Sequence, residues 1–239
     1  MIAIILAAGR GSRLEKYTNN LPKSLLPLVD NQTILDYNLD LLTRISVDHV
    51  YIITGYNSEM IEKHIEKRTN VSTVYNPFWN HCNVLGSFYM SFPVIREDFL
   101  FLHADTLADE EVWNKLKMSE KPVVLPFERK ICGEEEMKVL IDQEGKLVEI
   151  SKTMNPDVAA GEFLGIAKFS YSLLGDIKNA SDKLFKTGDL NYYMESVITQ
   201  FINQGVEIET FSIGDSRFVE IDFEEDYLKA RDVFGAKDK

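Results

Sequence analysis

Two glycines and two arginines follow directly after an apolar run near the start of the chain. The run covers residues 2 to 8, and the segment Gly9-Arg-Gly-Ser-Arg13 begins immediately after it. Glycines after a strand let backbone N–H groups approach a phosphate that a Cβ atom would hold off, and the Arg13 guanidinium can bind a polyphosphate in a bidentate manner. The segment matches neither the Walker pattern nor the three-glycine dinucleotide motif. A tight turn without a ligand is therefore the alternative to a phosphate-binding loop.

A lysine between two prolines is the second candidate for chemistry. Lys23 follows Pro22 and precedes Leu25, Leu26 and Pro27. Because the proline restricts the backbone on one side and the leucines should anchor the other, we expect the ammonium group to be held in one place. A fixed positive charge suits the negative charge that builds up on a phosphoryl group during its transfer. A solvated surface charge is the alternative for a lysine considered alone.

The elements around these residues follow the pattern of a doubly wound α/β sheet. The apolar run at residues 2 to 8 is typical of a parallel strand that is buried on both faces. Further strands are expected at 47 to 54 and 71 to 75, alternating with helices at 33 to 46 and 58 to 67. A buried strand at 99 to 103 should deliver Asp105 at its carboxyl end, where open α/β sheets bind their ligands.

The second half of the chain predicts a change of architecture. Residues 137 to 142 and 147 to 152 have the pattern of a β-hairpin. The other expected elements are helices at 87 to 94, 109 to 117, 189 to 204 and 223 to 234, and strands at 122 to 127, 163 to 169, 206 to 213 and 218 to 222. We expect a single domain over residues 1 to 234, followed by a tail at 235 to 239.

The composition excludes some classes of function. The chain has 239 residues, 45% of them hydrophobic, which is enough for a sizeable core. Its 26 basic and 38 acidic residues give a net charge of −12, so neither nucleic acid nor an anionic membrane is expected as a partner. The apolar run at residues 2 to 8 is too short for a signal core or a membrane span, and Cys82 and Cys132 lack metal or redox spacing. We expect a cytoplasmic monomer or homodimer with free thiols.

Taken together, Leu6-Ala-Ala-Gly-Arg-Gly-Ser-Arg-Leu14 and Pro22-Lys-Ser-Leu-Leu-Pro27 resemble the signature of nucleotidyltransferases that activate sugar phosphates and related headgroups. The resemblance implies a Rossmann-like, three-layer α/β fold with a mixed, mainly parallel sheet and a small β-hairpin extension. It also implies a reaction that joins a nucleoside triphosphate to a phosphorylated acceptor and releases pyrophosphate. Residues 1 to 105 would form the nucleotide-binding half, and residues 106 to 234 the acceptor-binding half.

The same resemblance implies roles for individual residues. Lys23 and Arg13 are the expected catalytic residues, with Lys23 stabilising the α-phosphate under attack. Leu102-His-Ala-Asp105 and Glu220-Ile-Asp222 are similar to the family's metal-binding segments, so Asp105 and Asp222 are expected to bind Mg²⁺, although a helix cap or turn is the alternative for either alone. The implied nucleotide-binding set is Leu6, Ala7, Ala8, Gly9, Gly11, Ser12, Asn83, Gly86, Ser87 and His103. For His103, an ordinary packed histidine is the alternative.

Within this family the chain is most similar to bacterial phosphocholine and 2-aminoethylphosphonate cytidylyltransferases, which use CTP. The segments that carry this similarity are Asn76-Pro-Phe78, Asn83-Val-Leu-Gly-Ser87, Met137-Lys-Val139, Glu149-Ile-Ser-Lys152, Gly161-Glu-Phe-Leu-Gly-Ile166 and Glu220-Ile-Asp222. The resemblance implies that Lys138 and Lys152 neutralise the acceptor phosphate and that Glu162 lies nearby. Tyr193 and Glu195 complete the expected acceptor-binding set.

The sequence leaves the acceptor itself open. A quaternary ammonium group should need an aromatic box, for which the candidates are Phe78, Trp79, Tyr192 and Tyr193. Lys138 would repel such a group, and Glu195 would either pair with a cationic headgroup or lie on a solvated helix face. A primary amine, an amino acid phosphate and a polyol phosphate all stay compatible with the pattern. The alternatives to a cytidylyltransferase are a sugar-1-phosphate nucleotidyltransferase that uses UTP, dTTP or GTP, and a nucleotide-binding regulatory protein without catalysis.

Overall fold

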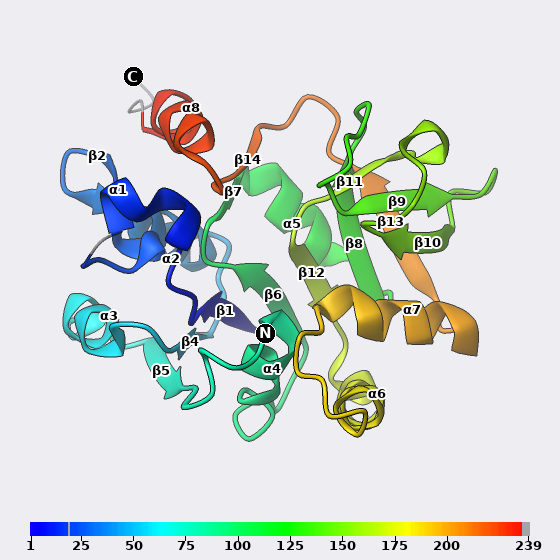
Figure 1. The fold of residues 1–239 in the computed structure, drawn as a ribbon, viewed down its shortest axis with the longest axis horizontal. Helices are drawn as coiled ribbons and strands as arrows, with labels where there is room; N and C mark the ends of the chain where they lie inside the picture. The colour runs from blue at the N-terminus through cyan, green and yellow to red at the C-terminus, as the bar shows by residue number, and fades with distance from the viewer. Residues whose placement is uncertain (19, 236–239) are drawn as a thin grey trace.

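The computed structural model describes residues 1–18 and 20–235 and has a three-layer α/β architecture (Figure 1). A ten-stranded mixed sheet has the order β10-β9-β11-β8-β12-β6-β1-β4-β5, and β13 pairs with β8 outside this path. The predicted fold class, with a mixed, mainly parallel sheet between helices, is confirmed. Of the predicted tail at 235 to 239, Gly235 alone lies among the described residues. No helix in the described part of the chain is long and apolar enough to cross a membrane.

Four parallel strands form the half of the sheet that contains the N-terminal strand. β1 (Ile2–Ala7) lies between β4 (His49–Thr54) and β6 (Phe99–His103), and β5 (Val71–Tyr75) pairs with the other side of β4. β1 is buried along most of its length because helices cover both faces of the sheet, as its continuous apolar sequence predicts. Leu6 pairs with His103, so the segments that follow β1 and β6 emerge side by side.

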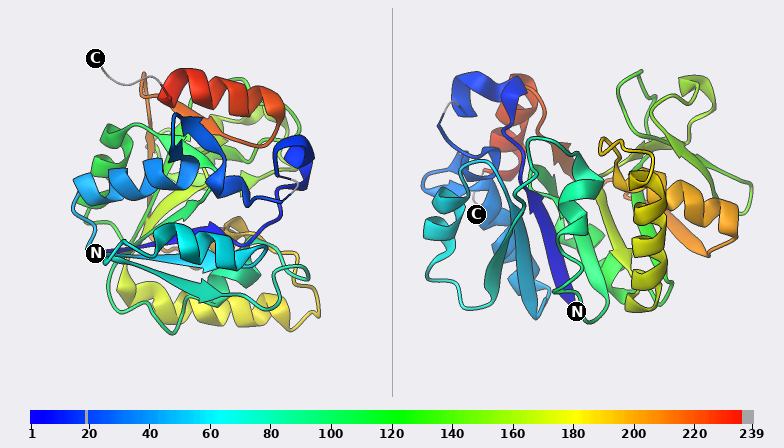
Figure 2. Two further views of the ribbon diagram at one scale, coloured as in Figure 1. Left: turned by 90° about the vertical axis from the view of Figure 1, so that its left-hand side faces the viewer. Right: turned by 60° about the horizontal axis from the view of Figure 1, so that its bottom comes forward.

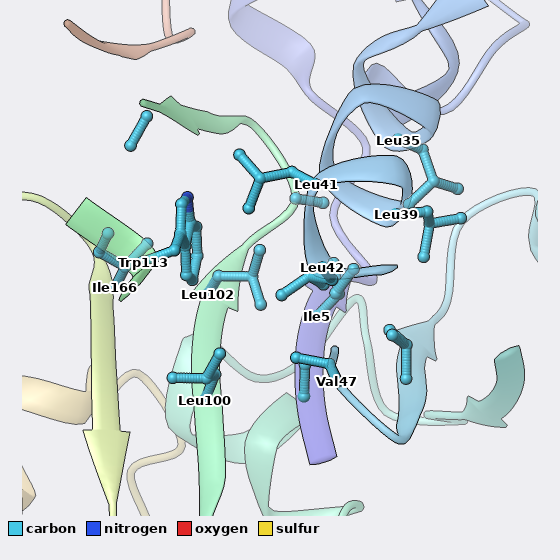
Figure 3. Packing of buried hydrophobic residues seen from close by; sticks show 14 of the residues in the cluster. Ile5, Leu35, Leu39, Leu41, Leu42, Val47, Leu100, Leu102, Trp113 and Ile166 are labelled. Atoms are coloured by element: carbon cyan, nitrogen blue, oxygen red, sulfur yellow. The ribbon is translucent and has the colours of Figure 1, made fainter. Parts of the chain in front are cut away.

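Helices pack on both faces of the sheet. One face carries α2 (Ile34–Arg44), α3 (Ser58–Ile65) and α5 (Glu110–Met118), and the other carries α4 (Val84–Tyr89), α6 (Leu174–Phe185) and α7 (Met194–Gln204). Figure 2 shows α2 and α6 on opposite sides of the sheet. Figure 3 shows Leu41 and Leu42 of α2 packed toward Leu102 of β6, and each fully buried leucine of this kind contributes about 1.5–3 kcal/mol to folding.

The start of α2 shows how local sequence fixes an element. Thr33 and Asp36 form a capping box, in which the Asp36 backbone N–H donates to Thr33 Oγ1 at 3.0 Å and Asp36 Oδ2 accepts from the Thr33 backbone N–H at 3.0 Å. His64 Nε2 and Arg68 Nη2 each lie 3.0 Å from the Asp36 carboxylate. Asp36 therefore caps one helix and ties it to the end of α3.

The second half of the chain extends the same sheet, mostly with antiparallel strands. β12 (Ile166–Phe169) pairs antiparallel with β6 and with β8 (Val123–Glu128). β11 (Gly161–Phe163) connects β8 to the hairpin of β9 (Lys138–Ile141) and β10 (Leu147–Ser151), and β13 (Ile208–Ser212) runs parallel to β8. The β-hairpin predicted from the sequence is confirmed and forms one edge of the sheet.

A smaller group of elements brings the C-terminal segment to the N-terminal signature. β7 (Thr106–Ala108) pairs antiparallel with β14 (Phe218–Glu220). Helix α8 (Glu224–Phe234) packs beside β2 (Pro27–Val29), which pairs with β3 (Gln32–Thr33). The Tyr227 hydroxyl donates to the Pro27 carbonyl at 2.7 Å. The signature itself contains the short helices η1 (Ser12–Leu14), α1 (Glu15–Thr18) and η2 (Lys23–Leu25). These contacts place residue 222 beside the loop that follows β6.

Two predicted helix boundaries on one face of the sheet are wrong. The helix expected at 87 to 94 is α4, which begins at residue 84 because the Asn83 side chain caps it. The helix expected from residue 189 begins at Met194. The preceding residues are held in an irregular segment, since the carbonyls of Leu190 and Tyr192 accept backbone hydrogen bonds from Asn83 and Leu85 at 3.0 and 2.9 Å. Pairing between distant segments, which local periodicity cannot show, therefore sets both boundaries.

Other differences concern elements in the second half of the chain. The strand expected at 163 to 169 is divided into β11 and β12, because Gly165 has a φ of +67° that a regular strand cannot accommodate. Helix α6 and strand β7 were not predicted. β7 comes immediately after Asp105 and therefore determines the direction in which the chain leaves the end of β6.

Candidate active site

The glycine segment after β1 forms a loop with space above it. Gly11 has a φ of +68°, a left-handed conformation that favours glycine, and it precedes η1, which carries Arg13. A Cβ atom on Gly11 would lie 3.1 Å from Lys23 Cβ, so the glycine also leaves room for the lysine. At Gly9, no atom of the described residues lies within 4 Å of an added Cβ, and this glycine lines a small cavity of about 80 Å³. Protein packing does not require a glycine there, whereas the close approach of a phosphate would.

Lys23 is fixed by the backbone on both sides, as the sequence predicts. Pro22 precedes the short helix η2, and Leu25 and Leu26 are 7% and 2% exposed. The Lys23 ammonium lies 2.6 Å from Asp105 Oδ2 and 3.3 Å from an oxygen of Asp222. The lysine is therefore a bridge between the ends of two strands that are distant in sequence.

The two aspartates reach this position through strand pairing. Asp105 follows β6 directly, and Asp222 follows β14, which pairs with β7. The Ile221 backbone N–H donates to the Asp105 carbonyl at 3.1 Å, which fixes the two segments relative to each other. Arg13 Nη1 donates to Asp222 Oδ2 at 2.8 Å. Arg13, Lys23, Asp105 and Asp222 thus form one ionic network, which we call the strand-end network.

Lys23 and Asp105 hold each other in their charged forms. Burial alone would lower the pKa of Lys23, but the carboxylates of Asp105 and Asp222 outweigh burial and raise it above its ordinary value. Burial would likewise raise the pKa of Asp105, but Lys23 outweighs this effect and the pKa is lowered. The pair is therefore an ammonium group and a carboxylate across the neutral range.

A cavity of about 530 Å³ opens beside the strand-end network. The predicted site residues that line it are Gly11, Ser12, Arg13, Lys23, His103, Asp105, Lys152, Glu162, Tyr193, Glu195 and Asp222. Leu6, Ala7 and Gly9 line the smaller cavity, which shares Gly11, Lys23 and Asp105 with the larger one. The structure therefore gathers most of the predicted catalytic, metal-binding and acceptor-binding residues around one hollow at the carboxyl ends of β1 and β6.

Four predicted nucleotide-binding residues line neither cavity: Ala8, Asn83, Gly86 and Ser87. The Asn83 side chain caps α4, and the Ser87 hydroxyl, which is nearly buried, accepts a hydrogen bond from Asn76 Nδ2 at 3.1 Å. A Cβ on Gly86 would lie 2.5 Å from Cys82 Cβ, so this glycine is required by packing. Val84, which was not predicted, lines the larger cavity instead. The nucleotide-binding role of the four residues stays a prediction.

The structure contradicts the prediction that Lys138 neutralises the acceptor phosphate. Its side chain is fully buried, and its ammonium donates to the carbonyls of Gly133 and Glu134 at 3.0 Å and of Glu136 at 3.1 Å. All three N–H donors are used inside the protein, and Lys138 does not line the cavity. Its role is to shape the loop at 133 to 136, which forms part of the cavity wall.

Two ion pairs in the cavity wall were not predicted from the sequence. His103 Nδ1 lies 3.6 Å from Glu220 Oε1. Burial would lower the pKa of His103, but the Glu220 carboxylate outweighs the effect of burial, so the pKa is raised. Lys130 Nζ lies 2.9 Å from Glu162 Oε2, which offsets part of the rise that burial causes in the pKa of Glu162. A signal existed for Glu220, because it stands two residues before Asp222 in the strand expected at 218 to 222, and such residues share one face of a strand. In the structure the strand ends at Glu220. Lys130 had no such signal.

The carboxylates at this edge fit a hard divalent cation. Ligand atoms of His103, Asp105 and Glu220 lie within 4.8 Å of one another, and Asp222 shares the Lys23 ammonium with Asp105. Mg²⁺ prefers one or two carboxylates together with substrate phosphates, so the oxygens of Asp105 and Glu220 suit it, whereas the His103 nitrogen is not a ligand that it prefers. Protein cations already contact both aspartates in the described chain, and a metal ion would compete with them.

The family described as the MobA-like NTP transferase domain matches residues 3–180 of the chain. The match covers more than half of the chain and includes the glycine loop, Lys23 and Asp105. The chain therefore belongs to this family. It is a nucleotidyltransferase, an enzyme that transfers a nucleotidyl group from a nucleoside triphosphate.

Relatives and solved structures extend over nearly the whole chain. The CTP:phosphoglutamine cytidylyltransferase of Campylobacter jejuni is 24% identical over 95% of this chain and 97% of its own length. The choline-phosphate cytidylyltransferase of Streptococcus pneumoniae is 25% identical over 98% of both chains. The structure of the inositol-1-phosphate CTP transferase from T. maritima covers 97% of this chain and 94% of its own, with a TM-score of 0.78 at 20% identity, and therefore has the same fold.

A sugar-phosphate enzyme also matches, but over a shorter stretch. The D-glycero-alpha-D-manno-heptose 1-phosphate guanylyltransferase of Aneurinibacillus thermoaerophilus is 33% identical over 45% of this chain and 47% of its own length. The likeness to this enzyme therefore leaves more than half of each chain unmatched.

Proposed function

We propose that the protein is a Mg²⁺-dependent cytidylyltransferase that joins CTP to a small phosphorylated or phosphonylated headgroup and releases pyrophosphate. The observation that carries the proposal is the strand-end network beside the large cavity, in which Lys23 bridges Asp105 and Asp222 at 2.6 and 3.3 Å. This network brings a fixed positive charge and carboxylate oxygens together at one point, and those oxygens would bind the metal ion of the proposal. Phosphoryl transfer depends mainly on positioning and on such electrostatic stabilisation.

In the proposed reaction an oxygen of the acceptor phosphate attacks the α-phosphorus of CTP. A new P–O bond forms, the bond from the α-phosphorus to the α,β-bridging oxygen breaks, and pyrophosphate leaves with that electron pair. No general base is required, because the acceptor phosphate is already anionic at neutral pH. Lys23 would stabilise the charge at the α-phosphate, and Arg13 would bind the leaving phosphates after releasing Asp222.

Asp105 and Asp222 would hold the Mg²⁺ ion, with Glu220 as a further oxygen donor. When bound, the ion supplies Lewis-acid neutralisation of phosphate charge. The residues of the chain would do the rest: the glycine loop would orient the triphosphate, and Lys23 would turn from the aspartates toward it.

The preference for CTP and a headgroup phosphate rests on the extent of the similarity. The two cytidylyltransferases named above match over 95% and 98% of this chain, whereas the heptose-phosphate guanylyltransferase matches over 45%. A sugar-1-phosphate nucleotidyltransferase that uses UTP, dTTP or GTP is the rival. A regulatory protein without catalysis is less well supported, because Arg13, Lys23, Asp105 and Asp222 are all present and in contact.

Initial rates of pyrophosphate release test the proposal. The enzyme is incubated with Mg²⁺ and each of CTP, UTP, dTTP and GTP, in combination with a panel of headgroup phosphates, phosphonates and sugar 1-phosphates. We expect CTP with a headgroup acceptor to give the highest rate. A higher rate with a sugar 1-phosphate and another nucleotide would favour the rival, and no release with any pair would favour the regulatory protein.

A further inference from the structure

Asn38 is a polar side chain on the otherwise apolar buried face of α2. Its side chain is fully buried, and the other buried residues of the helix are Ile34, Leu35, Leu39, Leu41 and Leu42. Its Nδ2 atom donates to the Thr106 carbonyl at 3.1 Å, whereas its Oδ1 atom has no hydrogen-bond partner among residues 1–18 and 20–235. A buried amide with an unpaired oxygen is less favourable than an apolar side chain in the same place. Packing alone therefore does not account for an asparagine at this position.

The hydrogen bond from Asn38 satisfies the outer edge of β7. β7 and β14 form a two-stranded sheet, so in the described chain no strand pairs with the other edge of β7. In an antiparallel pair alternate carbonyls face the partner strand, and those between them face away. The carbonyls of Thr106 and Ala108 both face α2, where the second accepts from the Tyr37 hydroxyl at 3.2 Å. Two consecutive residues of α2 therefore hold the strand that follows Asp105.

Asp105 itself lies in the turn between β6 and β7, outside the regular pairing of either strand. Three hydrogen bonds to three different elements fix this turn. The Ala104 backbone N–H donates to a carbonyl of β1 at 3.0 Å, and the Asp105 carbonyl accepts from the Ile221 N–H at 3.1 Å. The third is the bond from Asn38 to the Thr106 carbonyl, the one of the three that a side chain makes. Because two successive carbonyls are held from opposite sides, the backbone direction at Asp105 is fixed.

We infer that Asn38 is a positioning residue of the active site, which fixes the turn at 104 to 106 so that the Asp105 carboxylate meets the Lys23 ammonium at 2.6 Å. This inference rests on the proposed function for the chemistry that Lys23 and Asp105 perform. Asn38 lines neither cavity, so it acts through Asp105 and not by contact with a substrate. A displacement of about 1 Å in a catalytic group can reduce a rate about 10²-fold, so a buried hydrogen bond behind the site can control turnover.

Two substitutions of opposite size remove the donor at position 38. Asn38→Ala leaves a void and Asn38→Leu adds volume, so an effect that both share comes from the lost hydrogen bond. In both variants we expect kcat for pyrophosphate release, measured with the substrate pair that the wild type uses best, to fall about tenfold or more. Wild-type kcat in either variant would overturn the inference. A chain that folds with neither substitution would assign Asn38 to the core alone and would also overturn it.

Tyr37→Phe is the matched control for these variants. It removes the other side-chain donor to the same edge of β7, but the carbonyl that loses its partner belongs to Ala108, three residues after Asp105. We expect the Tm to fall because a hydrogen bond is lost, while kcat stays within about twofold of wild type. A loss of kcat equal to that of the Asn38 variants would show that any loosening of β7 slows the enzyme, and would overturn the particular role of Asn38.

A measurement without substrate or metal separates this inference from the proposed function. Thermal unfolding is followed for Lys23→Met in three chains: wild type, Asn38→Ala and Tyr37→Phe. If Asn38 aligns Asp105 with Lys23, the Tm decrease that Lys23→Met causes should be about half or less in the Asn38→Ala chain and unchanged in the Tyr37→Phe chain. That pattern would support the inference even if no substrate pair released pyrophosphate. Equal decreases in all three chains would overturn it, even for an enzyme that proves to be a cytidylyltransferase.

Discussion

Replacing Lys23 by methionine removes the charge of the strand-end network while keeping most of the aliphatic stem. The ammonium group that lies 2.6 Å from Asp105 and 3.3 Å from Asp222 is then absent. Loss of one fixed donor to the charge of a transition state costs about 2.7–4 kcal/mol, so kcat should fall by about 10²–10³-fold. Pyrophosphate release with saturating CTP and acceptor measures this fall directly.

The same substitution should lower stability by a modest amount. A hydrogen bond between charged groups contributes about 1.5–3 kcal/mol, and we count the Asp105 contact alone because the Asp222 side chain is 41% exposed. For a chain of this size the expected decrease in Tm is therefore about 3–12 °C. Added Mg²⁺ should raise the Tm of the variant more than that of the wild type, because the freed carboxylates no longer have a competing protein cation.

Lys16→Met is the matched control for this experiment. Lys16 belongs to the same N-terminal segment, but its 2.9 Å ion pair with Glu224 lies on the surface. We expect turnover within about twofold of wild type and no resolvable change in Tm, because the pair is exposed to solvent. Near-normal pyrophosphate release by Lys23→Met, in a chain whose circular dichroism is unchanged, would refute the catalytic role of Lys23.

Three further predictions follow from individual contacts. Asp105→Asn should abolish the dependence of pyrophosphate release on Mg²⁺ concentration, and an unchanged dependence would remove Asp105 from the metal site. Gly11→Ala should reduce turnover at least tenfold while the chain still folds. The reason is that the alanine would have to adopt a φ of +68° and its Cβ would lie 3.1 Å from Lys23 Cβ. Wild-type rates in this variant would show that the loop tolerates a side chain. Asp36→Asn should lower the free energy of unfolding by about 1–3 kcal/mol at pH 7. Burial would raise the pKa of Asp36, but hydrogen bonds from Thr33 and the nearby His64 outweigh burial, so the pKa is lowered. The stabilisation that Asp36 provides is therefore fully present above the ordinary carboxyl pKa. It is lost as the pH falls through the lowered pKa. Urea denaturation at several pH values should show the gap to wild type closing below about pH 4, and a gap that is constant with pH would contradict this account.

The N-terminal signature and the strand-end rule predicted the centre of the site. Arg13 and Lys23 have local patterns around them, and Asp105 follows a strongly apolar strand, so each position can be read from a few neighbouring residues. Because carboxyl ends of parallel strands meet at one edge, these residues were expected to converge. The structure adds that β7 and β14 pair, which is the contact that brings Asp222 to the same point.

The acceptor wall was less predictable, because tertiary contacts decide it. A lysine at the start of a hairpin strand has the same local sequence whether it faces a ligand or, as Lys138 does, three backbone carbonyls. Helix periodicity allowed Glu195 to lie on a solvated face. In the structure the segment before α7 pairs with the start of α4, so α7 begins later than expected from the sequence. The Glu195 side chain is buried in the cavity wall. No pattern in a single sequence encodes such pairings between distant segments.

The identity of the nucleotide product tests the central claim most directly. Mass spectrometry is performed on reactions of the wild-type enzyme with Mg²⁺ and each of CTP, UTP, dTTP and GTP, and each nucleotide is offered headgroup phosphates, headgroup phosphonates and sugar 1-phosphates in parallel. The account predicts a cytidine nucleotide conjugate of a headgroup acceptor, formed in equal amount to pyrophosphate and in preference to the products of the other nucleotides. Formation of a sugar nucleotide from another triphosphate in preference to this conjugate, or no nucleotide conjugate from any combination, would contradict it.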